Sequence, residues 1–328
     1  MGVKPILSST LTRIGVVQNP FSTLNRKRYG VEQVAANDPD VFVEQARQTH
    51  DIAGILARFR DLGVEIVVID GGDGTVREVL SQCSGVFGDN LPLFCTLPSG
   101  KTNVCAHDTG TAKYKRDTFR RLLELRKAGI TAQHIRRRHV MRVEWEDGFH
   151  PPVHGMLVGF GGYRDATNLA QTHVHSKGLN HNAAVAMTIF SFFCGAIFGA
   201  DEKGVRAGEN MVISFDEQPA GQHSRFGAVL TTLDSFLLGV WPFWGDASRA
   251  VKWLDVDAPP PHLLRAVFAI FTKRIKPWME ASGYRSGSAN QLQIETHNPF
   301  IIDGETFAPG PTGRLRFTSD MQVDFIAP

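Results

Sequence analysis

The first part of the chain alternates between short apolar runs and segments with helical periodicity. Three runs have the length and composition of buried strands, and they cover residues 12–20, 64–70 and 92–100. Residues 41–63 carry apolar side chains near helical spacing, with Gly63 placed as a C-terminal cap, and a second helix is predicted from Val76. Strands that alternate with helices predict a parallel α/β sheet with right-handed crossovers.

The pattern changes after Arg138, where short runs of alternating apolar and polar residues take over. These runs cover residues 139–147, 208–217, 290–298 and 313–326. Alternation with a period of two is typical of antiparallel strands that expose one face. We therefore predict an α/β domain over residues 1–138 and a mainly antiparallel β domain with inserted helices over residues 139–328.

Composition adds the length and the charge balance to this picture. The 328 residues suffice for two domains with cores, and the charged residues, 21% of the chain, are nearly balanced. Neither disorder nor a purely electrostatic partner such as nucleic acid is indicated. The N-terminus shows no apolar signal-peptide region, so we expect a cytoplasmic protein. Scattered cysteines without paired spacing fit a reducing compartment and structural thiols, and they are Cys83, Cys95, Cys105 and Cys194.

One uncharged segment, residues 182–200, has about the length of a bilayer span. It is rich in small residues and lacks flanking basic clusters, which favours a buried helix over a spanning one. A buried helix that lines an apolar cleft for a lipid chain is the third interpretation.

Residues 67–80 place three glycines around Asp73, where a strand gives way to a helix. Open α/β sheets bind ligands beyond the carboxyl ends of their strands, and a helix N-terminus attracts phosphate. Asp73, as an exposed turn acid, would bind ribose hydroxyls or a Mg²⁺ that bridges phosphates. The alternative is structural: Thr75 and Glu78 would form a capping box after a tight glycine turn.

Two common phosphate loops are excluded by residue spacing. A dinucleotide fingerprint needs glycine where Arg77 stands, and a P-loop that ends at Lys101 and Thr102 needs glycine where Cys95 stands. A nucleotide would therefore need a different loop arrangement.

The pentapeptide of residues 71–75, followed by Glu78, resembles the signature of the diacylglycerol kinase catalytic domain superfamily, which includes sphingosine and ceramide kinases. Related NAD kinases share the pentapeptide. Further segments are similar to family motifs in the family's order, and they are residues 16–22, 97–103, 158–163 and 299–307.

The resemblance implies an α/β nucleotide domain followed by a β-sandwich domain, with ATP and a lipid alcohol meeting between them. It implies ATP and Mg²⁺ as cofactors and a lipid as substrate. The residues that would bind the nucleotide are Asn19, Ser22, Gly71, Gly72, Asp73, Gly74, Thr75, Glu78, Lys101, Thr102 and Asn103.

The resemblance also implies that Asp303 and Glu305 supply the carboxylate that takes the proton from the attacking hydroxyl, with Glu305 as first choice. Strand alternation would put both carboxylates on one face, where one of them would titrate high in a dry cleft. An acidic β-turn without a catalytic role is the alternative.

The sequence departs from the family pattern at several positions. Thr23 stands where glycine is usual, and Lys101 and Val104 stand where threonine and aspartate are common. Lys101 would add a cation near the phosphates, or it would mark a different nucleotide preference. Residues 250–252 replace an Asp-Asp-Gly, so the ligands of the family's structural metal stay unassigned.

Residues 113–142 are rich in lysine and arginine, which predicts either a solvated helix face or contact with an anionic membrane surface. The second interpretation would place the protein at the inner membrane face. His173, His175 and His181 lack the companion ligands that a metal site would need.

Three functions remain open: a lipid kinase of the diacylglycerol kinase type, an NAD-kinase-like enzyme for a soluble acceptor, and a non-catalytic lipid- or nucleotide-binding relative. The sequence does not indicate which lipid would be phosphorylated. It is also compatible with a homodimer.

Overall fold

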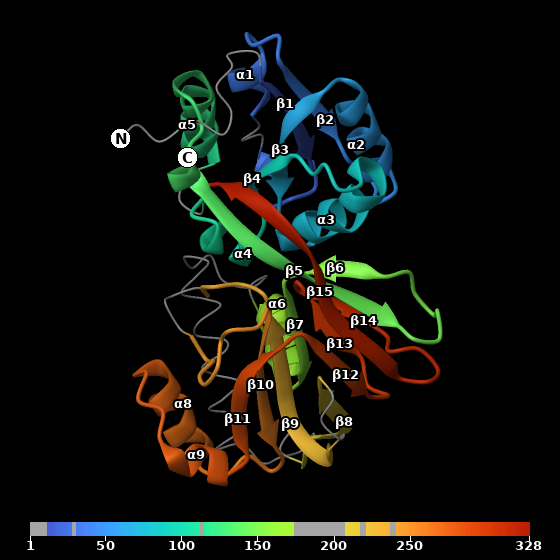
Figure 1. Cartoon of the computed structure of the whole chain (residues 1–328), viewed down its shortest axis with the longest axis vertical. Helices are drawn as coiled ribbons and strands as arrows, with labels where there is room; N and C mark the ends of the chain where they lie inside the picture. The colour runs from blue at the N-terminus through green and yellow to red at the C-terminus, as the bar shows by residue number, and fades with distance from the viewer. Residues whose placement is uncertain (1–11, 28–30, 112–114, 174–206, 217–220, 237–240) are drawn as a thin grey trace. The chain divides into compact units, whose positions relative to one another are not determined.

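The computed structural model describes residues 12–27, 31–111, 115–173, 207–216, 221–236 and 241–328. The chain divides into two compact units. The first unit contains Met1–Arg138 and Gln322–Pro328, and the second contains His139–Met321. Figure 1 traces the elements along the chain.

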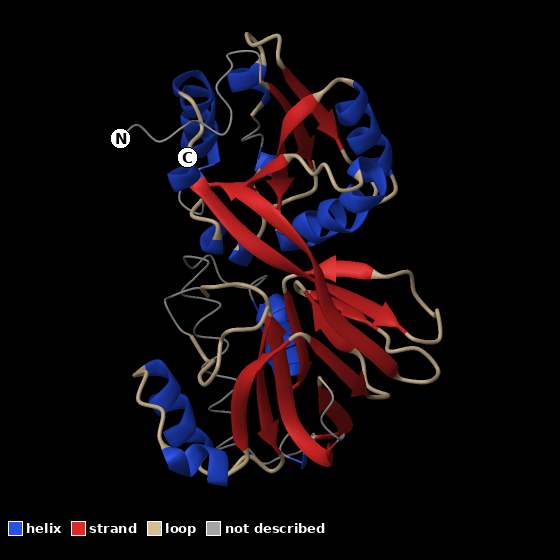
Figure 2. Ribbon diagram, in the orientation of Figure 1, coloured by secondary structure: helices blue, strands red, loops and turns tan. Residues whose placement is uncertain are grey.

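The first unit is built on a parallel sheet with the strand order β15-β4-β3-β1-β2. Its strands are β1 (Arg13–Gln18), β2 (Val41–Gln45), β3 (Val64–Gly71), β4 (Leu93–Pro98) and the end of β15 (Arg314–Ile326). The pairs β1–β2, β1–β3, β3–β4 and β4–β15 are all parallel, which confirms the predicted sheet. Figure 2 shows these strands between helices.

Helices cover both faces of this sheet. The helical elements of the first unit are η1 (Asn25–Lys27), α1 (Glu32–Ala35), α2 (Asp51–Asp61), α3 (Asp73–Phe87), α4 (Val104–Asp108), α5 (Lys115–Ala128) and η2 (Ala132–His134). Strand alternation turns Ile66 and Val68 toward α5, where they pack with Phe119 and Leu122 in one buried cluster. The other face meets α2, whose Phe59 lies against Gly15.

The predicted helix over residues 41–63 is wrong in its first part. Val41–Gln45 forms β2, and α2 begins only at Asp51. The β-branched and aromatic residues at the start of this segment suit a strand, and pairing with the edge of β1 satisfies their backbone groups. The predicted cap is confirmed, because Gly63 follows α2 in the left-handed conformation with φ of 67°.

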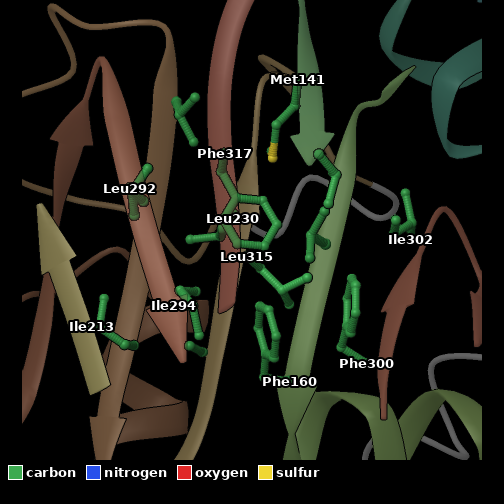
Figure 3. Close-up of a cluster of buried hydrophobic side chains, with 14 of the residues drawn as sticks. Met141, Phe160, Ile213, Leu230, Leu292, Ile294, Phe300, Ile302, Leu315 and Phe317 are labelled. Atoms are coloured by element: carbon green, nitrogen blue, oxygen red, sulfur yellow. The ribbon is translucent and has the colours of Figure 1, made fainter. Parts of the chain in front are cut away.

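The second unit is mainly antiparallel, as predicted. Its strands are β5 (Ile135–Trp145), β6 (Val153–Gly155), β7 (Leu157–Gly161), β8 (Glu209–Phe215), β9 (Gly221–Thr231), β10 (Val251–Asp257), β11 (Tyr284–Ala289), β12 (Gln291–Glu295), β13 (Phe300–Ile302), β14 (Glu305–Phe307) and most of β15. Every pair whose register lies within this unit is antiparallel. Side chains from ten of these strands meet in one apolar core, where Phe160 stacks on Phe300 (Figure 3).

Three described helices complete the second unit: α6 (Gly162–His173), α8 (Leu263–Phe271) and α9 (Pro277–Ala281). Buried residues of these helices and of β9, β10 and β11 form a second, smaller apolar cluster. The cluster fixes α8 and α9 beside the edge formed by β10 and β11 (Figure 1).

The last seven residues return to the first unit. Strand β15 begins in the second unit beside β12 and ends beside β4, where Phe325 pairs with Phe94. The sequence-based boundary had assigned this tail to the second domain. The sequence pattern predicts one long strand here, and it does not show that the two ends of this strand pair with different partners.

In the described residues no helix is long and apolar enough to cross a membrane. The uncharged segment of residues 182–200, together with Cys194, His175 and His181, lies outside them. The remaining cysteines, Cys83, Cys95 and Cys105, are buried free thiols. Burial raises the pKa of Cys83 and of Cys95 to about 12, which fits a structural role.

A buried ion-pair network connects three strands of the second unit. Asp255 on β10 is 2% exposed, and it accepts hydrogen bonds from Arg225 on β9 at 2.8 Å and from Arg285 on β11 at 2.9 Å. Arg225 is equally buried, so the negative charge of Asp255 is needed to stabilise its positive charge.

Replacing Asp255 by Asn should therefore lower the free energy of unfolding by about 3–5 kcal/mol, because a buried guanidinium would lose its counter-charge. Asp61→Asn is the matched control, since Asp61 and its partner Arg60 are 66% and 50% exposed. That control should change stability by less than about 1 kcal/mol. Urea titration of both variants tests this, and equal stabilities would contradict it.

Candidate functional site

The predicted nucleotide residues of the first unit lie where β1, β3 and β4 end. Parallel strands bring their carboxyl ends to one edge of the sheet. The loop after β1 contains Asn19 and Ser22, the turn after β3 contains residues 71–75, and the turn after β4 contains residues 99–103. The fold thus brings three segments together that are far apart in sequence.

Glycine allows the two turns to approach each other closely. A Cβ atom on Gly100 would lie 2.5 Å from the Cα of Gly72, and a Cβ on Gly72 would lie 3.0 Å from the Cα of Gly100. A Cβ on Gly71 would lie 2.4 Å from Thr75. Side chains at these positions would force the backbones apart.

Asp73 joins the two turns. It is the first residue of α3, which therefore begins before the predicted position at Val76. Its carboxylate accepts the hydroxyl of Thr102 at 2.8 Å and the backbone N–H of Cys105 at 3.0 Å. Asp73 is half-buried, so the expectation of an exposed turn acid is wrong: the start of α4 packs against it.

Two helix N-termini meet at this carboxylate. Asp73 opens α3, and its bond to Cys105 satisfies an N–H in the first turn of α4. Each N-terminus carries a partial positive charge, which stabilises an anionic side chain. The same field would favour a phosphate group.

The loop after β1 is bonded to the glycine turn. The side-chain amide of Asn19 donates to the hydroxyl of Thr75 at 2.9 Å. The Ser22 hydroxyl donates to the carbonyl of Asn19 at 3.0 Å, which tightens the loop. Three of the predicted residues are thus joined in one network.

The remaining nucleotide candidates have different positions. Asn103 adopts a left-handed conformation with φ of 53°, and its side chain bonds both backbone groups of Gly100. Lys101 is exposed at the tip of the turn after β4. Gly74 lies in the first turn of α3, and Glu78 accepts a bond from the neighbouring Arg77. The proposed capping box is absent from this described helix, whose N-cap is Gly72 without a side-chain bond.

Asp70, a residue that the sequence analysis missed, lies fully buried beneath the turns. Its carboxylate accepts bonds from Ser99 at 2.5 Å, Gln18 at 3.2 Å and the ammonium of Lys115 at 2.7 Å. Gln18 and Asp70 are paired residues of the neighbouring strands β1 and β3, and Ser99 directly follows the end of β4. An acid near the end of a mostly apolar strand was the available signal.

Lys115 brings a buried positive charge to this network from the start of α5. Burial lowers the pKa of Lys115, and the Asp70 carboxylate opposes that shift. Lys115 also donates to Asn25, whose amide donates to the carbonyls of Asn19 at 2.8 Å and Asp70 at 3.2 Å. Lys115 and Asp70 therefore help to fix the loop after β1 through Asn25.

Several other members of the basic stretch are used in ion pairs of the first unit. Arg126 pairs with Asp38, and Arg138 pairs with Asp108 at 2.5 Å. These arginines stabilise the first unit through ion pairs, a role that neither interpretation of the basic stretch had included. The exposed members on α5 are Arg120, Arg121 and Lys127.

Asp303 and Glu305 do not share a strand face as the sequence analysis expected. Asp303 and Gly304 form the two-residue turn between β13 and β14, with φ of 46° and 85°. This turn needs left-handed residues, which Asp and Gly tolerate. Glu305 is the first residue of β14 and is exposed.

The Asp303 carboxylate is fixed within the second unit. It accepts the backbone N–H of Met156 at 3.1 Å and of Leu157 at 2.9 Å, at the start of β7. These bonds hold the hairpin of β13 and β14 against β7. Asp303 thus positions the turn, while the Glu305 side chain is accessible to solvent.

In the part of the chain that the structure describes, no group of three or more His, Cys, Asp or Glu side chains could hold a metal ion. Of the three histidines weighed as a metal site, only His173 falls within a described helix.

The contact between the two glycine turns predicts a stability difference. Gly100→Ala should lower the free energy of unfolding by about 1–3 kcal/mol, because its Cβ meets backbone. Gly85→Ala on α3 is the control: nothing lies within 4 Å of its Cβ, so it should stabilise by about 0.5–1 kcal/mol. Urea titrations of both variants test this prediction. A Gly100→Ala variant as stable as the parent would refute the close contact between Gly72 and Gly100.

Comparison with known proteins finds similarity in the first unit. Residues 13–137 match the family model of the diacylglycerol kinase catalytic domain. A 60-residue segment is 38% identical to the "Probable lipid kinase YegS" of Shigella flexneri, and this segment spans 18% of the chain and 20% of that relative.

Solved structures share the fold of the whole chain. A "putative diacylglycerol kinase" from Bacillus anthracis str. Sterne superposes with a TM-score of 0.63 at 14% identity, covering 99% of this chain and 98% of that one. A second structure, of a diacylglycerol kinase from the same organism, gives a TM-score of 0.58 at 14% identity over 96% of each chain. At this identity the structures show the fold alone, and the family match is confined to residues 13–137, which resemble the diacylglycerol kinase catalytic domain.

Proposed function

We propose that the protein is an ATP-dependent lipid kinase that phosphorylates a hydroxyl of diacylglycerol or a related lipid alcohol. The observation that carries the proposal is the meeting of two glycine turns and two helix N-termini at Asp73. It lies inside the segment that matches the kinase family. The first unit would bind ATP, and the second unit would bind the lipid.

Phosphoryl transfer depends mainly on positioning and on stabilisation of charge. Backbone amides at the starts of α3 and α4 would face the phosphates, and the absence of side chains at Gly72 and Gly100 would let the phosphates approach. Asn19 and Thr75 would orient the loop after β1 toward the same group. Lys101, exposed at the tip of its turn, would add a positive charge.

Asp73 has the chemistry to hold Mg²⁺ together with the nucleotide. A carboxylate offers about four lone-pair sites, and two hydrogen bonds leave room for a metal. Magnesium bound to nucleotides commonly takes only one or two protein carboxylates. When bound, the ion would neutralise charge that develops on the phosphate oxygens.

Glu305 is the proposed base that accepts the proton of the lipid hydroxyl. It is exposed, and it follows a turn that Asp303 fixes to β7. A carboxylate on a rigid hairpin can be held within hydrogen-bond reach of a bound alcohol. Asp303 would act through the position of this hairpin.

A cytoplasmic enzyme that meets its substrate at the inner membrane face fits this proposal. An NAD-kinase-like enzyme is the alternative within phosphoryl transfer, since the glycine pentapeptide is shared. Incubation with labelled ATP and either a lipid panel or NAD, followed by thin-layer separation, distinguishes the two. Labelled lipid supports the proposal, labelled NADP replaces it, and no product with either acceptor indicates a non-catalytic relative.

Nucleotide binding at the glycine turn can be tested with Asp73→Asn. The variant keeps the side-chain shape but loses the negative charge, so the rise in melting temperature with ATP and Mg²⁺ should be largely lost. Asp61→Asn on α2 should retain the full rise, because Asp61 is exposed. An undiminished rise in Asp73→Asn would remove this site from the proposal.

The role of Glu305 predicts a loss of turnover without a loss of ATP binding. Glu305→Gln should lower the initial rate of lipid phosphorylation by about 10²–10⁴-fold. Asp303→Asn should also be impaired, since it weakens the bonds to β7. Glu146→Gln, an exposed carboxylate of the same unit, is the control and should keep the parent rate.

Rates measured at several pH values, beside an ATP titration, complete this test. If Glu305→Gln and Asp303→Asn both turn over like the parent, the hairpin is only a structural turn. The ATP site would be unaffected by that result.

A further inference from the structure

The outer face of α8 carries two exposed apolar side chains. Phe268 is 66% exposed and Leu264 is 46% exposed. They are four residues apart, so they lie next to each other on one face of the helix. A surface helix of a soluble protein normally turns polar residues to this side.

The inner face of α8 already supplies what the fold needs. Leu263, Ala266 and Ala269 are buried in the cluster that also contains Met279 of α9 and Tyr284 of β11. The outer apolar pair therefore contributes little to the stability of the second unit. Its exposure costs solvation free energy in water, which a binding partner would recover.

Basic residues lie on α8 and in the segment that follows it. Residues 259–283 contain a single acidic residue, Glu280, and the basic residues are Arg265, Lys273, Arg274 and Lys276. All four basic side chains are exposed. The Arg265 guanidinium lies 4.5 Å from the centre of the Trp278 ring, which orients this side chain.

This combination is the signature of a surface that lies on a membrane. Interfacial helices place Phe and Leu at the boundary of the acyl chains and Lys and Arg among the headgroups. Trp side chains are enriched at the same depth. Apolar burial and charge attraction are both needed, because either one alone binds a membrane weakly.

We propose that α8, with the segment of residues 272–278 that leads into α9, docks on the surface of an anionic bilayer. Leu264 and Phe268 enter the acyl boundary, and the four basic residues contact the headgroups. This inference rests on the proposed function, because the substrate of a lipid kinase resides in such a bilayer.

A second copy of the chain fits this surface less well. A stable protein interface buries about 1,000 Å² or more, whereas the outer apolar face is one helical turn with two large side chains. A symmetric interface would also bring two sets of basic residues together, which repel. Negative headgroups offer the complementary charge.

Sedimentation with lipid vesicles tests the proposal without depending on catalysis. The full chain should bind vesicles of equal parts phosphatidylglycerol and phosphatidylcholine, and bind pure phosphatidylcholine vesicles much more weakly. The double variant Leu264→Ser/Phe268→Ser should lose at least about 10-fold in affinity. The triple variant Lys273→Gln/Arg274→Gln/Lys276→Gln should lose on the order of 100-fold.

Phe149→Ser is the matched control, because Phe149 is 54% exposed in the same unit but lies between β5 and β6, away from α8. It should bind vesicles like the parent. Urea titration of each variant verifies that the fold is intact. Equal binding by parent and double variant, or no binding by the parent, would overturn the proposal.

Two further measurements separate this inference from its alternatives. If the double substitution changes the oligomeric state in gel filtration and leaves vesicle binding intact, the face is a subunit contact and the proposal fails. Phosphorylation of a short-chain, water-soluble diacylglycerol should be unchanged in the double variant. Activity on that acceptor without vesicle binding by the parent would uphold the kinase and refute the docking surface.

Discussion

The fully buried carboxylate of Asp70, near the end of β3, constrains the edge of the sheet where β1, β3 and β4 end. An ionised Asp70 without partners would cost several kcal/mol, so its neighbours must supply bonds and a counter-charge. They come from β1, from the turn after β4 and from α5, in the side chains of Gln18, Ser99 and Lys115. One residue therefore fixes the relative positions of four elements.

The candidate nucleotide site follows from that constraint. When β3 and β4 are held side by side at this edge, the turns that follow them pack closely together. This close packing requires glycine at positions 72 and 100, because a Cβ atom would clash with the facing backbone. Asp73 then reaches the start of α4 and connects the turns. Protein contacts hold the candidate site in place, and the proposed charge-stabilising catalysis would require such preorganisation.

The second unit uses buried charge for the same purpose and exposed apolar surface for another. Asp255 and Asp303 each bind neighbouring strands, so the charges fix the sheet and the hairpin of Glu305. On α8 the outer face is apolar as well as the buried one, because Leu264 and Phe268 are exposed on a helix with basic residues on and after it. The proposed lipid kinase would use both properties: a rigid frame around the reacting groups and a surface that docks on the membrane.

The sequence by itself determined the elements whose signals are local. Strands β1, β3 and β4, the glycine turn before α3, the cap at Gly63 and the change to antiparallel structure after Arg138 all follow from periodicity and turn chemistry. The resemblance to the kinase family over residues 13–137 was also visible in the motifs.

The tertiary structure decided what depends on partners distant in the chain. Val41–Gln45 became a strand because β1 offered it an edge, and the end of β15 joined the first unit because β4 offered another. The importance of Asp70 appears only once Lys115 is beside it. Charge and hydrogen-bond satisfaction are properties of neighbours in space, and a linear pattern records the neighbours in sequence.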